Sequence, residues 1–192
     1  MKLKLYCRKI YKIIKAPIDF AYSRLFPEKF AKHIGVNAKG FFRVFGKVNW
    51  GTEPWIITHG ENVYITNNVA FVTHDGGTLL FRKYQPDLEI TKPIVIGNDV
   101  YIGMNSMIMP GVTIGDKCII GAGSIVTKDI PGNSVAVGVP ARVIKTADEY
   151  YEKIKKESLK LGHLVGKEKD IALRKYYGYE KGKVGGINNA KT

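Results

Sequence analysis

The sequence contains few of the features that mark disulfide-bonded, zinc-binding or membrane-spanning proteins. It has two cysteines in 192 residues, Cys7 and Cys118, and their spacing fits neither a disulfide framework nor a metal site. No apolar run approaches the roughly 20 residues that are needed to span a bilayer. Lys and Arg interrupt the N-terminal region too often for the apolar core of a signal peptide. We therefore expect a protein of the reducing cytoplasm.

Acidic residues are scarce at both ends of the chain but not in its middle. Residues 1–33 carry nine Lys or Arg against two Asp or Glu, and residues 141–192 carry thirteen against seven. Residues 34–140 carry eight of each sign. A nucleic-acid-binding domain more often has its basic stripe on the folded core, so the pattern disfavours nucleic acid as a partner. The basic flanks fit an anionic ligand or peripheral contact with the inner face of the membrane, and they equally fit helices that are merely solvated.

The middle of the chain has an internal repeat of six residues. An aliphatic residue recurs at every sixth position, and a small or medium side chain comes four residues after each of them. The aliphatic positions are Ile96, Ile102, Ile108, Ile114, Ile120 and Val126, and the positions four later are Val100, Ser106, Val112, Cys118, Ser124 and Ile130. A period of six fits neither a helix nor one strand. It suits a short strand followed by a corner, three of which close a triangular coil of about 18 residues.

This repeat predicts a mostly β fold, a parallel β-helix in which both sets of positions point into a narrow interior. Earlier hexads would place His59, Ile65 and Phe71 inward, with Val63, Val69 and Asp75 four residues later. Glycine follows four of the six aliphatic residues, and we expect it to permit a backbone conformation that a Cβ atom would penalise. An antiparallel protein with glycine-rich turns is the alternative, which six in-phase hexads disfavour.

The hexads and the charge pattern divide the chain into segments. We expect a basic helical N-terminal segment at 1–33, the β-helix at 34–145 with a loop at 76–92, C-terminal helices at 146–180 and a disordered tail at 181–192. Apolar residues within 2–15 form one helical stripe, which would lie on an anionic membrane, pack on the β-helix or pack on a neighbouring subunit. Thr146 and Glu149 have the spacing of a capping box, which predicts a helix start.

Two stretches resemble a known family. Trp55 to Lys145 resembles the hexapeptide-repeat acyltransferases, most strongly in Lys92–Lys145. Phe71-Val-Thr-His-Asp-Gly-Gly77 resembles the catalytic histidine segment of their sugar and polysaccharide O-acetyltransferase branch. The resemblance implies a left-handed parallel β-helix with flanking N- and C-terminal α-helices, a homotrimer, and acetyl-CoA as the acyl donor. It also implies transfer of the acetyl group to a hydroxyl of a sugar in a cell-surface polysaccharide or its precursor.

The same resemblance implies the roles of several residues. His74 would be the general base, a role that suits histidine because a neutral imidazole nitrogen accepts a proton near neutral pH; a loop histidine without a catalytic role is the simpler alternative. Asp75 would support the imidazole. The places that match the family's CoA-binding positions are Gly103, Ala122, Lys128 and Arg142. Asn67 and Trp55 are candidates for the acceptor side, which carries no motif.

Other functions stay open at this point. A small-molecule acceptor (serine, a free sugar or an antibiotic) is the alternative within the same chemistry, and a non-catalytic β-helix scaffold is the alternative outside it. A zinc hydratase of the β-helix carbonic anhydrase type needs three histidine ligands. Only His59 and His74 lie in the coil, and the close histidine pair of that family is missing. We therefore expect no metal.

Overall fold

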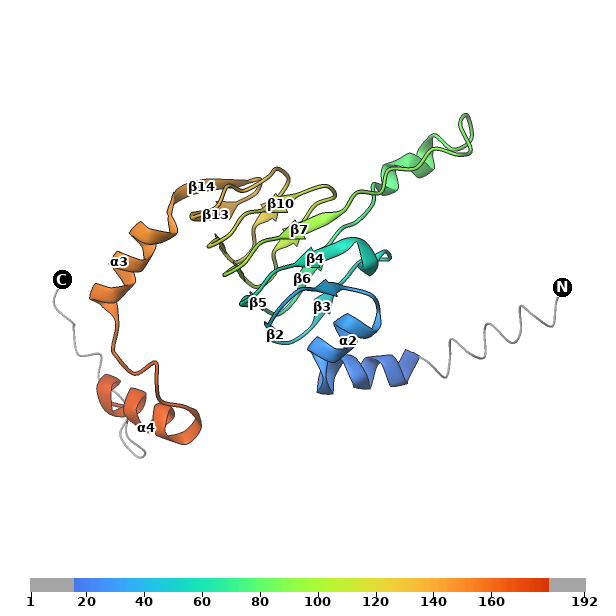
Figure 1. The fold of residues 1–192 in the computed structure, drawn as a ribbon. Helices are drawn as coiled ribbons and strands as arrows, with labels where there is room; N and C mark the ends of the chain where they lie inside the picture. The colour runs from blue at the N-terminus through green and yellow to red at the C-terminus, as the bar shows by residue number, and fades with distance from the viewer. Residues whose placement is uncertain (1–15, 180–192) are drawn as a thin grey trace. The chain divides into compact units, whose positions relative to one another are not determined.

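The computed structural model describes residues 16–179, and its central part is a prism of short parallel strands in three sheets (Figure 1). We call these sheets the first, second and third faces. The first face contains β1 (Asn37–Ala38), β4 (Ile57–His59), β7 (Ile94–Ile96) and β10 (Thr113–Ile114). The second face contains β2 (Phe42–Val44), β5 (Val63–Ile65), β8 (Tyr101–Ile102), β11 (Ile119–Ile120), β13 (Ser134–Gly138) and β14 (Ala141–Thr146). The third face contains β3 (Val48–Asn49), β6 (Val69–Phe71), β9 (Met107–Ile108) and β12 (Ile125–Val126). The chain visits the faces in this order on successive turns, which is the parallel β-helix that the repeat predicts.

The chain turns at three edges of the prism, and most of the candidate site residues lie on two of them. We call the edge that follows the second face the second edge; it contains Asn67, Gly103 and Ala122. The edge that follows the third face is the third edge, and it contains His74 and Lys128. Of the residues predicted for CoA binding, Gly103 and Ala122 therefore lie on one edge and Lys128 on another, whereas Arg142 belongs to β14.

The inward positions form the core, as the hexads predict. All of the six aliphatic positions from Ile96 to Val126 are buried, and so are the six positions four residues later. His59, Ile65, Phe71, Val63 and Val69 are buried too. Asp75 is exposed, so its predicted inward position is wrong: Thr73 is the last buried residue before the chain leaves the coil. Stacking apolar side chains between coils removes them from water, which is the main favourable contribution to the stability of such a repeat.

Close stacking of the coils, and not backbone conformation, explains the glycine that follows four of the six aliphatic residues. A Cβ atom on Gly103 would lie 2.5 Å from the backbone nitrogen of Ala122 in the next coil. The left-handed conformation instead occurs two residues later, at Asn105, where φ is 59°. Asparagine tolerates that region better than most residues. Our expectation about the glycine backbone is therefore wrong, because the constraint comes from the neighbouring coil.

The chain leaves the prism between β6 and β7. The excursion begins with the 3-10 helix η2 (Gly76–Leu80), and Figure 1 shows it as the green segment that projects from the coils. An antiparallel bridge between His74 and Thr91 closes its base. Asp75 N donates to Ile90 O and Lys92 N donates to Thr73 O, both over 2.9 Å. Backbone hydrogen bonds thus fix the residues at the base of the loop.

Helices precede the prism. Residues 16–25 are helical, and α2 (Pro27–His33) follows them. Ala31 of α2 is fully buried, and Val44 N of β2 donates to Glu28 Oε1 over 3.0 Å, so α2 packs on the β2 end of the prism. The helical stripe predicted at 2–15 lies outside the described residues. No helix of the described part of the chain is long and apolar enough to cross a membrane.

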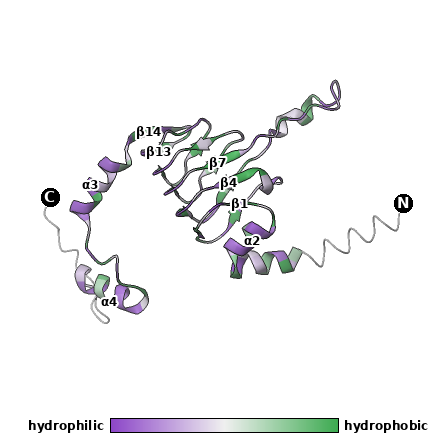
Figure 2. Cartoon of the chain, viewed as in Figure 1, coloured by the Kyte–Doolittle hydropathy of each residue, from purple (hydrophilic) through white to green (hydrophobic). Residues whose placement is uncertain are grey.

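The hairpin of β13 and β14 ends the prism, and α3 (Ala147–Glu157) follows it. The capping box is confirmed, since Glu149 N donates to Thr146 Oγ1 over 3.1 Å and Thr146 N donates to Glu149 Oε2 over 2.7 Å. The described residues from 151 to 179 belong to a second compact unit that includes α4 (Gly166–Tyr177). Figure 2 shows α3 and α4 as largely hydrophilic, whereas β4 and β7 are hydrophobic. The tail predicted at 181–192 lies outside the described residues.

Candidate active site

His74 lies on the third edge, at the base of the loop. The bridge to Thr91 fixes its backbone, and Thr73 before it is buried with 1% of its surface exposed. Because neighbouring side chains in an extended segment alternate in direction, His74 points away from the core. Its side chain is 39% exposed. The imidazole is thus rigidly placed and also reachable from solvent.

A carboxylate that the sequence reasoning missed lies beside this imidazole. Glu53 directly precedes the short helix η1 (Pro54–Ile56), and its Oε2 is 3.1 Å from His74 Nδ1. Two hydroxyls complete the group: Thr73 Oγ1 donates to Glu53 Oε2 over 2.5 Å, and Thr52 Oγ1 donates to Glu53 Oε1 over 2.7 Å. Thr52 Oγ1 is also 3.1 Å from His74 Nδ1. The hydrogen bond from Thr73, then that from Thr52, lower the pKa of Glu53 below its usual 4.5, and His74 adds to this.

This arrangement determines what the imidazole can do. A carboxylate next to Nδ1 favours the tautomer in which Nδ1 carries the proton and donates it to that carboxylate. Nε2 then carries the lone pair and is available to accept a proton. The Glu53–His74 pair therefore has the geometry of an oriented general base.

Glu53 could have been found by following the stacking of the coils. The register of the third face pairs Asn49 of β3 with Ala70 of β6, a separation of 21 residues. Glu53 and His74 are also 21 residues apart in the sequence, so they lie at equivalent positions of neighbouring coils. The sequence reasoning assumed coils of about 18 residues and so placed no partner beside His74.

Two hollows open beside His74 within the described residues. The larger, of about 400 Å³, has mostly apolar walls, and Lys92 is its one cationic side chain. Its apolar lining consists of Val72, Ile90, Met109 and Pro110. The smaller, of about 170 Å³, lies against the loop, and about half of its lining is polar. Its ionisable lining consists of His74, Glu53, Asp75, Arg82 and Glu89.

Asp75 does not take the place beside the imidazole that the sequence predicts for it. Its Oδ1 accepts a hydrogen bond from Gly77 N over 2.8 Å, which caps η2. Its backbone oxygen accepts from Thr78 Oγ1 over 3.0 Å. Asp75 therefore shapes the start of the loop, and Glu53 supplies the carboxylate at Nδ1.

The candidates for binding the pantetheine arm lie on the second edge. Gly103 N donates to Ile120 O over 2.8 Å, so the inter-coil ladder already uses this N–H. No acceptor for Ala122 N occurs among residues 16–179. Of these two residues, Ala122 has the backbone N–H that remains available to a ligand.

The candidates for phosphate contacts are exposed cations. Lys128 follows β12 on the third edge, the same edge as His74. Arg142 belongs to β14, and its Nη1 donates to Ala141 O over 2.9 Å. Neither residue lines the hollows beside His74.

The two candidates for the acceptor side lie in different places. Asn67 is on the second edge, and its Oδ1 accepts from Lys47 N over 2.8 Å, so it braces the neighbouring coil. Trp55 belongs to η1, two residues after Glu53, and is 62% exposed. Neither residue lines the hollows beside His74. No group of three potential metal ligands occurs within residues 16–179.

The chain is similar in sequence and fold to known proteins. The family model described as bacterial transferase hexapeptide (six repeats) matches residues 93–128. Galactoside O-acetyltransferase of Escherichia coli K12 is 39% identical over 151 residues, which cover 76% of this chain and 68% of that protein. Protein CapG of Staphylococcus aureus is 47% identical over 105 residues, 55% of this chain, and the match spans only 61% of CapG. A crystal structure of a galactoside acetyltransferase in complex with coenzyme A superimposes with a TM-score of 0.56 at 31% identity, covering 73% of this chain and 82% of that one.

Proposed function

The chain belongs to the hexapeptide-repeat acyltransferase family, whose fold is the left-handed parallel β-helix, and from this we propose that it is an acetyl-CoA-dependent O-acetyltransferase. The proposed acceptor is a hydroxyl of a sugar in a cell-surface polysaccharide or its precursor. The observation that carries the proposal is the Glu53–His74 pair, an oriented base at the junction of two open hollows. The names of a related galactoside O-acetyltransferase and of a related structure with bound coenzyme A support the acceptor and donor classes.

The mechanism follows from the position of the imidazole. Nε2 of His74 accepts the proton of the acceptor hydroxyl while its oxygen attacks the thioester carbonyl of acetyl-CoA. The carbon–sulfur bond then breaks, the CoA sulfur takes up a proton, and the products are an acetyl ester and CoA. Glu53 stabilises the imidazolium that forms between these steps. The larger hollow, with its apolar walls and Lys92, suits the acetyl end of the thioester arm.

We propose a homotrimer as the active assembly. His74 and Lys128 lie on the third edge, whereas Gly103 and Ala122 lie on the second edge of the same chain. Packing the second edge of one copy against the third edge of another would bring a base and a donor groove together. The proposed location is the cytoplasm, with the basic flanks as the peripheral contact to an anionic membrane surface.

The experiment uses the purified full chain, acetyl-CoA and a panel of acceptors, with thiol release as the rate and mass spectrometry of the acceptor as the product assay. The panel contains galactosides, maltose, oligosaccharide fragments of surface polysaccharides, and serine. We expect acetyl ester formation on a sugar. Exclusive acetylation of serine, or no transfer to any acceptor, would contradict the proposal.

A further inference from the structure

The smaller hollow beside His74 is built from both strands of the loop base. Arg82 comes from the outgoing half of the loop and Glu89 from the returning half. Arg82 Nε donates to Leu88 O over 3.0 Å, and its Nη2 bonds to Glu89 Oε2. Glu89 Oε1 in turn accepts from Thr91 Oγ1 over 2.7 Å, and Thr91 is the bridge partner of His74. Hydrogen bonds thus hold the far wall of this hollow to Thr91, which lies opposite His74 at the base of the loop.

The polar groups of this hollow are only partly used by the protein. Oδ1 of Asp75 accepts from Gly77 N, and no group within residues 16–179 bonds to its Oδ2. Arg82 has five N–H donors, of which Leu88 O and Glu89 take two. A ligand rich in hydroxyls would therefore find both an acceptor and several donors here, close to the base.

The charge of the walls favours one class of ligand over another. Three carboxylates (Glu53, Asp75 and Glu89) line the hollow against one guanidinium, that of Arg82. The guanidinium is already paired with Glu89. A negatively charged ligand in this hollow would be repelled by carboxylates that no cation neutralises, whereas an uncharged polyol would not be repelled. The volume of about 170 Å³ lies below the range of roughly 300–1,000 Å³ that is usual for drug-sized ligands, which suits a single sugar ring.

We propose that this hollow is the acceptor subsite, and that Glu53, Asp75 and Glu89 select an uncharged sugar ring and exclude uronic and sialic acids. This inference rests on the proposed function, because it places the reacting hydroxyl between the hollow and Nε2 of His74. Specificity then depends on repulsion of anions as much as on hydrogen bonds to hydroxyls.

The test compares two probes that differ only at C6, methyl glucoside and methyl glucuronide. Binding of each to the full chain is measured by NMR titration with CoA present, and acetyl transfer is measured separately. We expect the wild-type protein to bind the glucoside at least about tenfold more tightly than the glucuronide, the difference that roughly 1.4 kcal/mol of repulsion produces. Equal binding, tighter binding of the glucuronide, or binding of neither probe would overturn the inference.

Glu89→Gln tests the role of charge directly. Glutamine keeps the shape and acceptor oxygen of the side chain but removes one carboxylate and leaves the Arg82 guanidinium unneutralised. We expect the preference for the glucoside to shrink at least about threefold.

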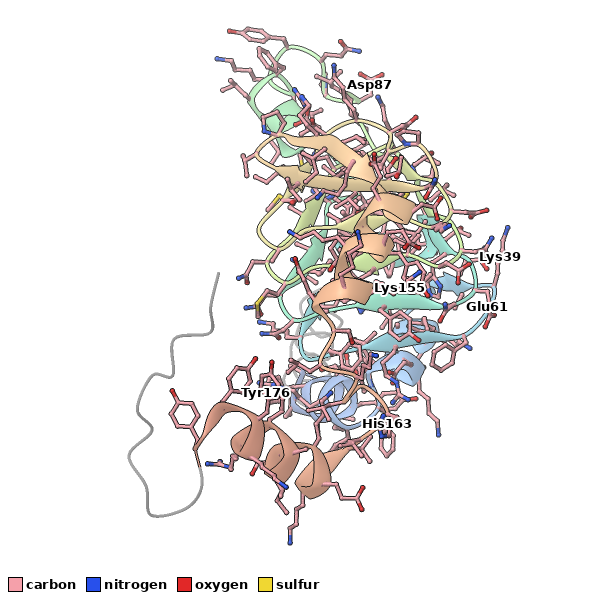
Figure 3. All side chains as sticks on the ribbon, turned by 90° about the vertical axis from the view of Figure 1, so that its left-hand side faces the viewer. Lys39, Glu61, Asp87, Lys155, His163 and Tyr176 are labelled. Atoms are coloured by element: carbon pink, nitrogen blue, oxygen red, sulfur yellow. The ribbon has the colours of Figure 1, made fainter. Side chains whose placement is uncertain are left out.

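Asp87→Asn is the matched control, because it also removes one negative charge from the loop. Asp87 is exposed in the far part of the loop, where Figure 3 labels it, and it does not line the hollow. Equal changes in the two variants would overturn the inference. Selective glucoside binding without transfer to any acceptor would support the subsite and refute the proposed function.

Discussion

Glu53 and His74 are separated by 21 residues, yet Oε2 of Glu53 lies 3.1 Å from Nδ1 of His74. The contact arises because one turn of the β-helix at this level contains 21 residues, as the pairing of Asn49 with Ala70 shows. The same turn brings the hydroxyls of Thr52 and Thr73 to the carboxylate. The contacts that orient the imidazole thus come from residues of the coil, namely Thr52, Glu53 and Thr73.

Glu53→Gln should lower kcat by at least about tenfold, because the amide no longer stabilises the imidazolium and can favour the wrong tautomer. The KM for acetyl-CoA should change little, since Glu53 does not line the larger hollow. Steady-state kinetics with the best acceptor of the panel measure both constants.

The double variant separates positioning from an independent role. If Glu53 acts through His74, adding Glu53→Gln to His74→Ala should lower kcat no further. Thus a multiplicative loss in the double variant would show that Glu53 acts on the substrate by itself.

Lys128→Ala and Arg142→Ala should each weaken CoA binding roughly tenfold, the effect of losing one charge-assisted hydrogen bond to a phosphate. Isothermal titration with CoA and with dephospho-CoA, which lacks the 3′-phosphate, identifies the phosphate concerned. Lys117→Ala is the control, because Lys117 pairs with Asp148. A fall in turnover with unchanged CoA affinity would contradict the assignment of these two residues.

His59 should make the stability of the protein depend on pH. Its ring is 1% exposed, packs 4.3 Å from the ring of Phe42, and has no partner for Nε2 among the described residues. Burial, and to a smaller extent the charge of Lys32, lower the pKa of His59 below its usual 6.5. The unfolded chain then binds the proton more readily, so the free energy of unfolding should fall as the pH drops below about 6.5, by at most about 1.4 kcal/mol per pH unit.

Urea unfolding at pH 7.5 and 5.5 measures this effect. His59→Leu should reduce the difference in stability between the two pH values, because leucine cannot be protonated in the core. His163→Asn is the control, since His163 is exposed in the second compact unit (Figure 3). An unchanged pH dependence in His59→Leu would show that other groups cause it.

The core of the fold was predictable because each inward position has a local signature. An aliphatic residue at every sixth position and a small one four later specify the buried set from Ile96 to Ile130 without knowledge of the partners. The reason for the glycines after the aliphatic residues was not predictable from such a local signature. The constraint on Gly103 comes from Ala122, a full coil later, and only the spacing of the coils reveals it.

The candidate site was predictable only in part, for a related reason. His74 could be singled out because the hexad phase breaks just after it, at the loop. Its partner Glu53 depends on the number of residues in one particular coil, which is 21 there but 18 between Met107 of β9 and Ile125 of β12. Asp75 was assigned to the imidazole by adjacency in sequence, whereas the start of η2 turns its carboxylate toward Gly77.

The most direct test of the account is the activity of His74→Ala with acetyl-CoA and the best sugar acceptor, measured together with its affinity for CoA. The account predicts a fall in kcat of roughly 10²–10⁴-fold, the usual contribution of a positioned general base, with the Kd for CoA unchanged. His33→Ala, at the end of α2, serves as the control and should retain full activity. Full activity in His74→Ala would contradict the central claim that this imidazole accepts the proton of the sugar hydroxyl.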